Sequence, residues 1–178
     1  MKTTMKNMAK VLVSIVLAAS SGMVYAATAT ATLNVTATIT SNCTIGTTPV
    51  AFGSYDPVSG GDITAAGTVI VACTKNAPGL SIDFGNGSNY ASSTRNMSGA
   101  SFSDKLAYSL LQPVSNAVGA ACPAMGAGTA WTAAGGALTL TTPSGKAART
   151  YNVCGQLAAG QDVSVDTYSD VVVATINF

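Results

Sequence analysis

The sequence contains no histidine and no glutamate, and only 8% of its 178 residues are charged. Catalytic triads, general acid–base pairs and metal sites therefore lack their commonest members. No Gly-x-Ser-x-Gly motif is present, and no helical pattern follows the glycine-rich stretches as a phosphate-binding loop requires. The seven aspartates are scattered through turn-forming stretches. We therefore expect no enzyme activity, no cofactor and no metal site.

The first residues predict a secretory signal peptide. Lys2, Lys6 and Lys10 form a basic region, "VLVSIVLAASSGMV" an apolar region, and "VYA" a small-residue cleavage site before Ala27. The apolar run is too short for a membrane-spanning helix. We assign residues 1–26 to the signal peptide and expect export to the periplasm and then to the cell exterior.

The remaining 152 residues, 178 less 26, suffice for one domain with a hydrophobic core. Five basic side chains stand against seven aspartates in this part, so its net charge is near −2. No basic patch is available for nucleic acid, and we expect no nucleic-acid partner.

The four cysteines of an exported chain predict two disulfides, for which three connectivities exist. Cys43 follows an alternating stretch and Cys73 ends an apolar strand pattern, so a bond between them ties two strands together. Cys122, in a glycine- and alanine-rich loop, then pairs with Cys154 in the "YNVC" strand. Each bond closes a loop of about 30 residues, which corresponds to roughly 3 to 4 kcal/mol.

Short apolar runs separated by turn signals predict an all-β sandwich. The run 104–112 would also suit a short helix, whereas residues 113–134, with the single tryptophan Trp131, read as a long loop. The predicted strands are 49–55, 67–74, 80–84, 104–112, a hairpin of 136–142 with 148–157, and a final strand over 167–178.

The stretch "ATATATLNVTATIT", Ala27 to Thr40, alternates apolar and polar residues without exception. This period of two predicts a strand with one buried and one solvated face. From the pattern alone, the strand either is the first strand of its own sandwich or fills the core of a neighbour.

Four tyrosines, at positions 90, 108, 151 and 168, allow two interpretations. They could form an aromatic surface that binds sugar, or each could pack within the sandwich. Packing is the more common role of such residues.

Six stretches, "NCTIG", "AFGSYDP", "VIVACT", "LAYSLL", "YNVCGQLAAGQDV" and "TYSDVVVATINF", occur in an order that resembles the spore coat protein U domain family. This family includes subunits of archaic chaperone-usher pili. The resemblance implies an incomplete immunoglobulin-like β-sandwich that lacks its last strand and is completed by donor-strand complementation. It assigns residues 27–40 to the N-terminal donor strand and residues 41–178 to the pilin domain.

The resemblance also implies partners and site residues. A periplasmic pilus chaperone first lends a strand to the groove, and an outer-membrane usher exchanges it for the donor strand of a neighbouring pilus subunit. The apolar face of the donor strand would be Leu33, Val35, Ala37 and Ile39. The face of the last strand that contacts the groove and the chaperone would be Val172, Ala174, Ile176 and Phe178.

The expected function is that of a structural subunit of an extracellular pilus that supports adhesion and biofilm formation. The alternative is a self-contained secreted coat or matrix protein that could bind carbohydrate and whose N-terminal strand folds into its own groove.

Overall fold

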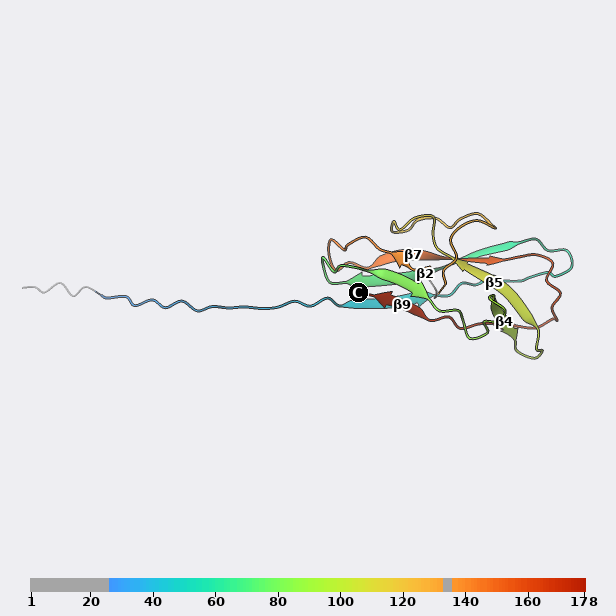
Figure 1. Cartoon of the computed structure of the whole chain (residues 1–178), viewed down its shortest axis with the longest axis horizontal. Helices are drawn as coiled ribbons and strands as arrows, with labels where there is room; N and C mark the ends of the chain where they lie inside the picture. The colour runs from blue at the N-terminus through green and yellow to red at the C-terminus, as the bar shows by residue number, and fades with distance from the viewer. Residues whose placement is uncertain (1–25, 133–135) are drawn as a thin grey trace, which may run out of the picture. The chain divides into compact units, whose positions relative to one another are not determined.

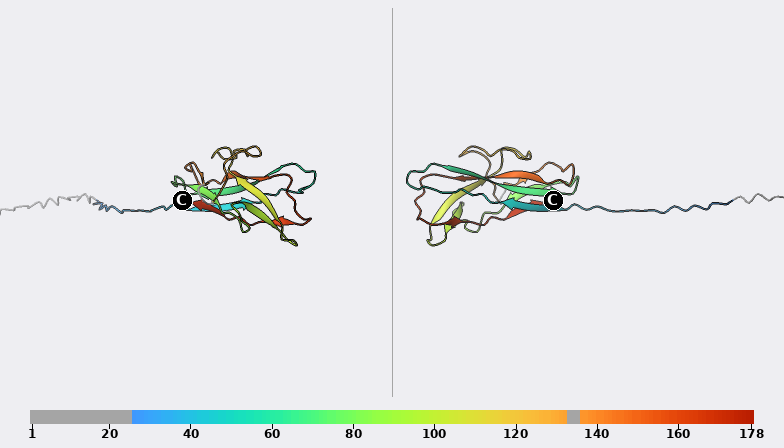
Figure 2. Two further views of the ribbon diagram at one scale, coloured as in Figure 1. Left: turned by 45° about the vertical axis from the view of Figure 1, so that its right-hand side comes forward. Right: turned by 180° about the vertical axis from the view of Figure 1, so that it is seen from behind.

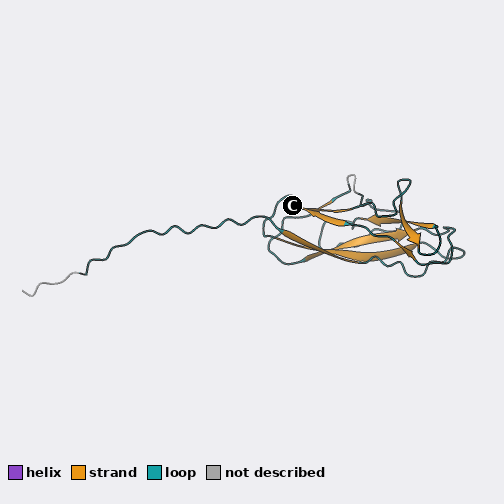
Figure 3. Cartoon of the chain, turned by 90° about the horizontal axis from the view of Figure 1, so that it is seen from below, coloured by secondary structure: helices purple, strands orange, loops and turns teal. Residues whose placement is uncertain are grey.

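The computed structural model describes residues 26–132 and 136–178, so nearly all of the predicted signal peptide lies outside the described residues. In the described part the chain consists of strands and loops, without a helix (Figure 3). Accordingly, no helix in this part could span a membrane. Residues up to 37 and residues 38–178 form separate units and are described separately.

The 38–178 unit contains two antiparallel sheets (Figure 1). The strands of the larger sheet are, in spatial order, β1 (Cys43–Thr48), β2 (Ile63–Cys73), β7 (Arg149–Leu157), β5 (Lys105–Leu111), β4 (Arg95–Gly99) and β8 (Tyr168–Ser169). The smaller sheet contains β6 (Leu138–Thr139), β3 (Ser81–Phe84) and β9 (Ala174–Asn177). Thus β1 and β9 are edge strands of different sheets, although they lie close to each other.

The core fills the space between the sheets, as a β-sandwich requires. Inward-facing residues alternate along the central strands, for example Val69 and Val71 of β2, both 0% exposed. Ile82 of β3 and Tyr151 of β7 are equally buried. The alternation in the sequence therefore produces the buried face that period-two patterning predicts.

Most predicted strands are confirmed, namely those that correspond to β2, β3, β5 and β7. The run 104–112 is a strand and not a helix, because its alternate side chains Leu106, Tyr108 and Leu110 enter the core. The predicted long loop is also present, with one isolated bridge between Leu111 and Ala130.

Three strand predictions were wrong in detail. Residues 49–55 form no strand. Residues 136–142 and 148–157 form no hairpin, because β6 pairs with β3 while β7 pairs with β2 and β5. The final strand is divided, since β8 pairs with β4 of one sheet and β9 with β3 of the other. Local alternation specifies an extended chain but not the partner strand.

In its described residues, 26–37, the N-terminal unit contains no strand either. Residues 26–42 are extended without a ladder, and the apolar side chains of Leu33, Val35 and Ile39 are 85%, 85% and 77% exposed. The alternating face that the sequence predicted is therefore present as a pattern but is unpaired.

Trp131 closes the core at the end of the long loop. Its side chain is 0% exposed, its indole N–H donates a hydrogen bond to the Ile82 carbonyl at 3.0 Å, and its ring meets Phe84 edge-on with centroids 4.7 Å apart. The sequence showed this residue only as part of a loop, and its contacts give that loop a structural role.

We predict that Trp131→Ala will lower the free energy of unfolding by about 3–5 kcal/mol, because it leaves a cavity between the sheets and an unpaired carbonyl. Guanidinium chloride unfolding of the mature chain measures this change. The control is Val58→Ala, at a side chain that is 93% exposed, which should leave the midpoint unchanged. Equal midpoints for the two variants would contradict the role of Trp131.

Candidate functional site

Two adjoining hollows, of about 560 and 500 Å³, form a groove in the 38–178 unit. One wall is the end of β1 with the segment that follows it, residues 47–57, and the other is the segment 163–172 that leads to β9. Val50, Phe52, Met97 and Tyr168 line both hollows, so the groove is continuous.

The floor and walls of the groove are apolar. Val50 and Phe52 on one wall, and Val163 and Tyr168 on the other, pack against the core while remaining half-buried. Phe52 meets the core residue Tyr108 edge-on, with ring centroids 6.2 Å apart. The groove therefore exposes side chains that belong to the hydrophobic core.

Gly155 of β7 allows the first wall to lie this close to the sheet. A Cβ atom at this position would lie 2.5 Å from Val50 Cγ1 and 2.8 Å from Phe52 Cζ, distances that real Cβ contacts do not show. Only glycine leaves room for both side chains.

The first wall has no partner strand. In the described part of the chain, residues 49–55 make no backbone–backbone hydrogen bond, and the ladder between β1 and β2 stops at Thr48. On the opposite side of the groove, β9 is the outer strand of its sheet. The predicted strand 49–55 thus fails to form because this chain does not place a strand beside it.

The second wall is held by side-chain hydrogen bonds. Asp166 accepts hydrogen bonds from the backbone amides of Ser101 and Phe102 at 2.6 and 3.0 Å, and Asp104 accepts one from the Ser164 amide at 2.8 Å. These bonds stabilise the ionised carboxylates and hold the pKa of both aspartates below the usual range.

A hydrogen bond from β5 supports the same wall, and β4 beside it carries a buried charge. Tyr108 donates a hydrogen bond to Asp170 at 2.7 Å, and burial together with Asp170 raises the pKa of Tyr108. Arg95, 5% exposed, donates to the carbonyls of Phe84 and Gly85 at 3.2 and 2.6 Å. Burial lowers the pKa of this guanidinium. Neither β4 nor Arg95 was predicted from the sequence.

The residues predicted for the groove occupy β9 and the segment before it. Val172 lines one hollow, and Val172, Ala174 and Ile176 are half-buried against the core, whereas Phe178 is 54% exposed. The other lining residues, such as Phe52 and Met97, come from segments far away in the sequence. In the sequence, only the alternation of apolar residues in these segments and Gly155 could have indicated them.

The comparisons with known proteins agree with this architecture. The chain matches the family model of the Spore Coat Protein U domain over residues 29–175. The chain belongs to this family. A curated relative, Protein U of Myxococcus xanthus, is 34% identical over 197 residues, which cover 97% of this chain and 99% of the relative.

A solved structure shares the fold. It is the crystal structure of the CsuC–CsuE chaperone–tip adhesion subunit pre-assembly complex from archaic chaperone-usher Csu pili of Acinetobacter baumannii. The match has a TM-score of 0.54 and 18% identity, and it covers 79% of this chain. It spans 41% of the matched chain, so the likeness concerns the sandwich and not that whole protein.

Both predicted disulfide pairs are present, Cys43–Cys73 and Cys122–Cys154. The first bond joins the first residue of β1 to the last residue of β2. The second attaches the long loop to β7, where Gln156 adds a hydrogen bond to the Ala124 carbonyl at 2.9 Å.

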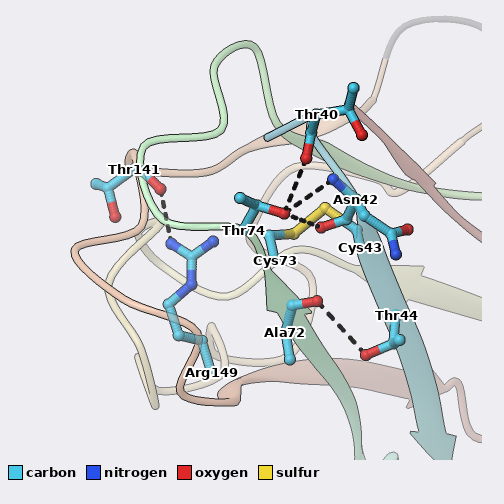
Figure 4. The surroundings of a disulfide bond; sticks show 9 residues. All are labelled: Thr40, Asn42, Cys43, Thr44, Ala72, Cys73, Thr74, Thr141 and Arg149. Carbon is cyan, nitrogen blue, oxygen red and sulfur yellow. Dashed lines mark hydrogen bonds between the residues drawn. A yellow bond between two sulfur atoms is a disulfide. The ribbon is translucent and has the colours of Figure 1, made fainter. Parts of the chain in front are cut away.

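Thr74 fixes the residues that precede β1 (Figure 4). Its hydroxyl accepts a hydrogen bond from the Asn42 amide at 3.1 Å and donates one to the Thr40 carbonyl at 3.4 Å. Its own amide donates to the Asn42 carbonyl at 2.8 Å. Because Cys73 is bonded to Cys43 alongside, the start of the domain is held by both covalent and polar contacts.

The tyrosines and the metal-ligating side chains are the remaining candidates. Tyr108 and Tyr151 are 8% and 0% exposed, which confirms the packing interpretation for these two tyrosines. Among residues 26–132 and 136–178, no group of three or more histidine, cysteine, aspartate or glutamate side chains could hold a metal ion.

We predict that Thr74→Val will accelerate hydrogen exchange of the Asn42 amide by about two- to tenfold, since a net hydrogen bond contributes about 0.5–1.5 kcal/mol. Exchange is measured by NMR on the mature chain. The control is Thr44→Val, which removes a single hydrogen bond to Ala72 and should leave Asn42 unchanged. An unaltered Asn42 exchange rate in Thr74→Val would contradict the anchoring role.

We predict that Asp166→Asn will lower stability at pH 7 and reduce its acid dependence. The carboxylate is stabilised in the folded state, so its contribution is complete above the ordinary pKa of 3.8 and disappears as the pH falls through the lowered value. Denaturation midpoints at pH 7 and pH 2 measure both effects.

The matched control for this prediction is Asp162→Asn. Asp162 is exposed and makes no side-chain hydrogen bond in the described part of the chain, so its replacement should leave the pH profile unchanged. If Asp166→Asn keeps the wild-type slope between the two pH values, the Asp166 hydrogen bonds do not stabilise the wall.

Proposed function

We propose that this chain is a structural subunit of an extracellular chaperone-usher pilus that polymerises by donor-strand exchange. The observation that carries the proposal is the groove, where core side chains lie open beside residues 49–55, a segment that has no partner strand in the described part of the chain. Exposed apolar surface and unpaired strand edges require a covering strand in a stable protein. Strand addition from another chain supplies it.

The proposed donor is the alternating segment 27–40. Leu33, Val35, Ala37 and Ile39 share one face, and the structure describes this segment without a strand and with its larger side chains exposed. Fully extended, its 14 residues span about 46 Å at roughly 3.3 Å per residue. Burial of the three larger side chains contributes about 1.5–3 kcal/mol each before the cost of ordering.

The proposed acceptor edge is β9 with its preceding segment, through Val172, Ala174, Ile176 and Phe178. A periplasmic chaperone would pair with this edge first, and an outer-membrane usher would then exchange its strand for a donor strand. The fold shared with a chain of a chaperone–subunit complex supports this assignment. Residues 1–26 would direct export, and the assembled fibre would support adhesion and biofilm formation.

The second candidate function is a self-contained coat or matrix protein, which the name of the Spore Coat Protein U domain family favours. In that case segment 27–40 would fill the groove of its own chain. The two functions differ in whether the apolar face of this segment acts between molecules.

The test is Val35→Asp in the mature chain. A carboxylate on the apolar face would enter the groove unpaired, at a cost of several kcal/mol, so fibres seen by electron microscopy should disappear. Thr36→Asp carries the same charge on the opposite, solvated face and is the matched control, which should still assemble.

A synthetic peptide of residues 27–40 provides the second measurement. We expect it to raise the melting temperature of the Val35→Asp chain, whose groove is left unfilled, whereas the same peptide with Val35→Asp should not. Normal fibres from the Val35→Asp chain, or a monomer that the peptide does not stabilise, would reject donor-strand exchange and favour the self-contained protein.

A further inference from the structure

Nine of the twelve charged side chains of the 38–178 unit lie at its two ends, and Asp83, Arg95 and Asp170 lie at neither. β2 runs from Ile63 at one end to Cys73 at the other, and its antiparallel neighbour β7 begins at Arg149 beside Val71. We call the end that contains Cys43, residues 73–79 and residues 141–149 the linker pole. The end that contains residues 56–62, 100–105 and 158–167 is the far pole.

Hydrogen bonds confirm that each pole is one surface. At the linker pole the Asn76 amide donates to the Pro143 carbonyl at 2.9 Å. At the far pole the Ala159 amide donates to Asp62 at 2.8 Å, and Ser164 donates to Asp104 as described above. Figures 1 and 2 show the C-terminus at the linker pole, where β1 begins.

The two poles carry opposite charge. The charged side chains of the linker pole are all basic: Lys75, Lys146 and Arg149, a side-chain charge of +3 that exceeds the single negative charge of the C-terminal carboxylate at this pole. The far pole carries five carboxylates and one ammonium, a charge of −4: Asp56, Asp62, Asp104, Asp162, Asp166 and Lys105. Hydrogen bonds to Asp56, Asp104 and Asp166 lower their pKa and keep these carboxylates ionised.

The poles of one subunit do not neutralise each other. The eleven residues of β2 separate them by about 35 Å, whereas charges in water at physiological ionic strength are screened beyond about 8 Å. Each pole therefore presents its charge to whatever approaches it.

We propose that the far pole of one subunit binds the linker pole of a second copy, and that this complementary contact steers polymerisation. The inference rests on the proposed function. A donor segment that fills the groove of a neighbour ends at residue 40, two residues before the linker pole of its own domain begins at Cys43. That linker pole must therefore lie at one end of the neighbour's groove.

Charge decides which end. If the donor left the groove at the neighbour's linker pole, two surfaces of charge +3 would meet, and the neighbour's own N-terminal segment would leave from the same place. If it leaves at the far pole, charges of +3 and −4 meet and each subunit can bind one partner at each end. Opposite charges raise association rates by about 10- to 1,000-fold, and salt reduces this effect.

The experiment compares four mature chains, refolded from guanidinium chloride with their disulfides intact, by the initial rate of polymer growth in light scattering. The linker-pole variant carries Lys75→Asp and Lys146→Asp, which change the charge of that pole from +3 to −1. The far-pole variant carries Val58→Lys, Ser103→Lys, Ala159→Lys and Asp162→Lys, which change −4 to +1. None of these side chains lines the groove, and all are exposed.

We expect each single-pole variant to polymerise more slowly than wild type at low salt, on the order of tenfold, because its poles now carry the same sign. The fourth chain combines all six substitutions and exchanges the signs of the poles. Its poles carry −1 and +1, so its rate should exceed that of both single-pole variants, whereas unspecific damage by the substitutions would accumulate. The wild-type rate should fall as sodium chloride is raised.

Wild-type rates for both single-pole variants at low salt, or a combined chain as slow as the single-pole variants, would overturn the pole contact while leaving donor-strand exchange intact. If the wild-type chain forms no polymer and peptide 27–40 does not stabilise the monomer, the proposed function fails and the pole contact fails with it.

Discussion

The structure depends on a β-sandwich that is open between residues 49–55 and the segment that leads to β9. Among the described residues, the backbone groups of 49–55 have no backbone partner, and beside them Phe52 and Tyr168 leave core surface open. A domain with weakly held walls would close over this groove. Here the nine-residue register between β2 and β7, the buried Trp131 and the hydrogen bonds of Asp166 hold the walls apart.

The sequence predicts the features that depend on local interactions, and it does not predict those that depend on residues far apart in the chain. Alternation and turn residues are local signals, and they located β2, β3, β5 and β7. Strand partners are not local: the stretches that become β6 and β7 look like a hairpin but enter different sheets. β4 escaped prediction because its inward residue is Arg95, a charged side chain whose burial depends on carbonyls of a distant strand.

The candidate site divides in the same way. The donor face and the alternation of Val172, Ala174 and Ile176 are visible as period-two patterns, and the structure leaves the first exposed and half-buries the second. The groove itself arises where residues 47–57 meet residues 163–172, more than one hundred positions later. No window of the sequence contains both walls, so the groove required the fold. The wrong strand prediction at 49–55 lies at this groove. An acceptor edge has the sequence pattern of a strand but no partner strand in its own chain, as residues 49–55 do.

In a polymer, the position of the first disulfide determines how mechanical load enters the domain. If subunits are joined through segment 27–40, tension along the fibre enters each domain at Asn42 and Cys43, the first residue of an edge strand. β1 has a neighbour on one side only, so its hydrogen bonds to β2 would open one after another under such a load. The Cys43–Cys73 bond transfers the load directly to β2, a strand that pairs with β1 on one side and with β7 on the other. The covalent link therefore lies where the edge strand would open first and where the donor segment joins the domain.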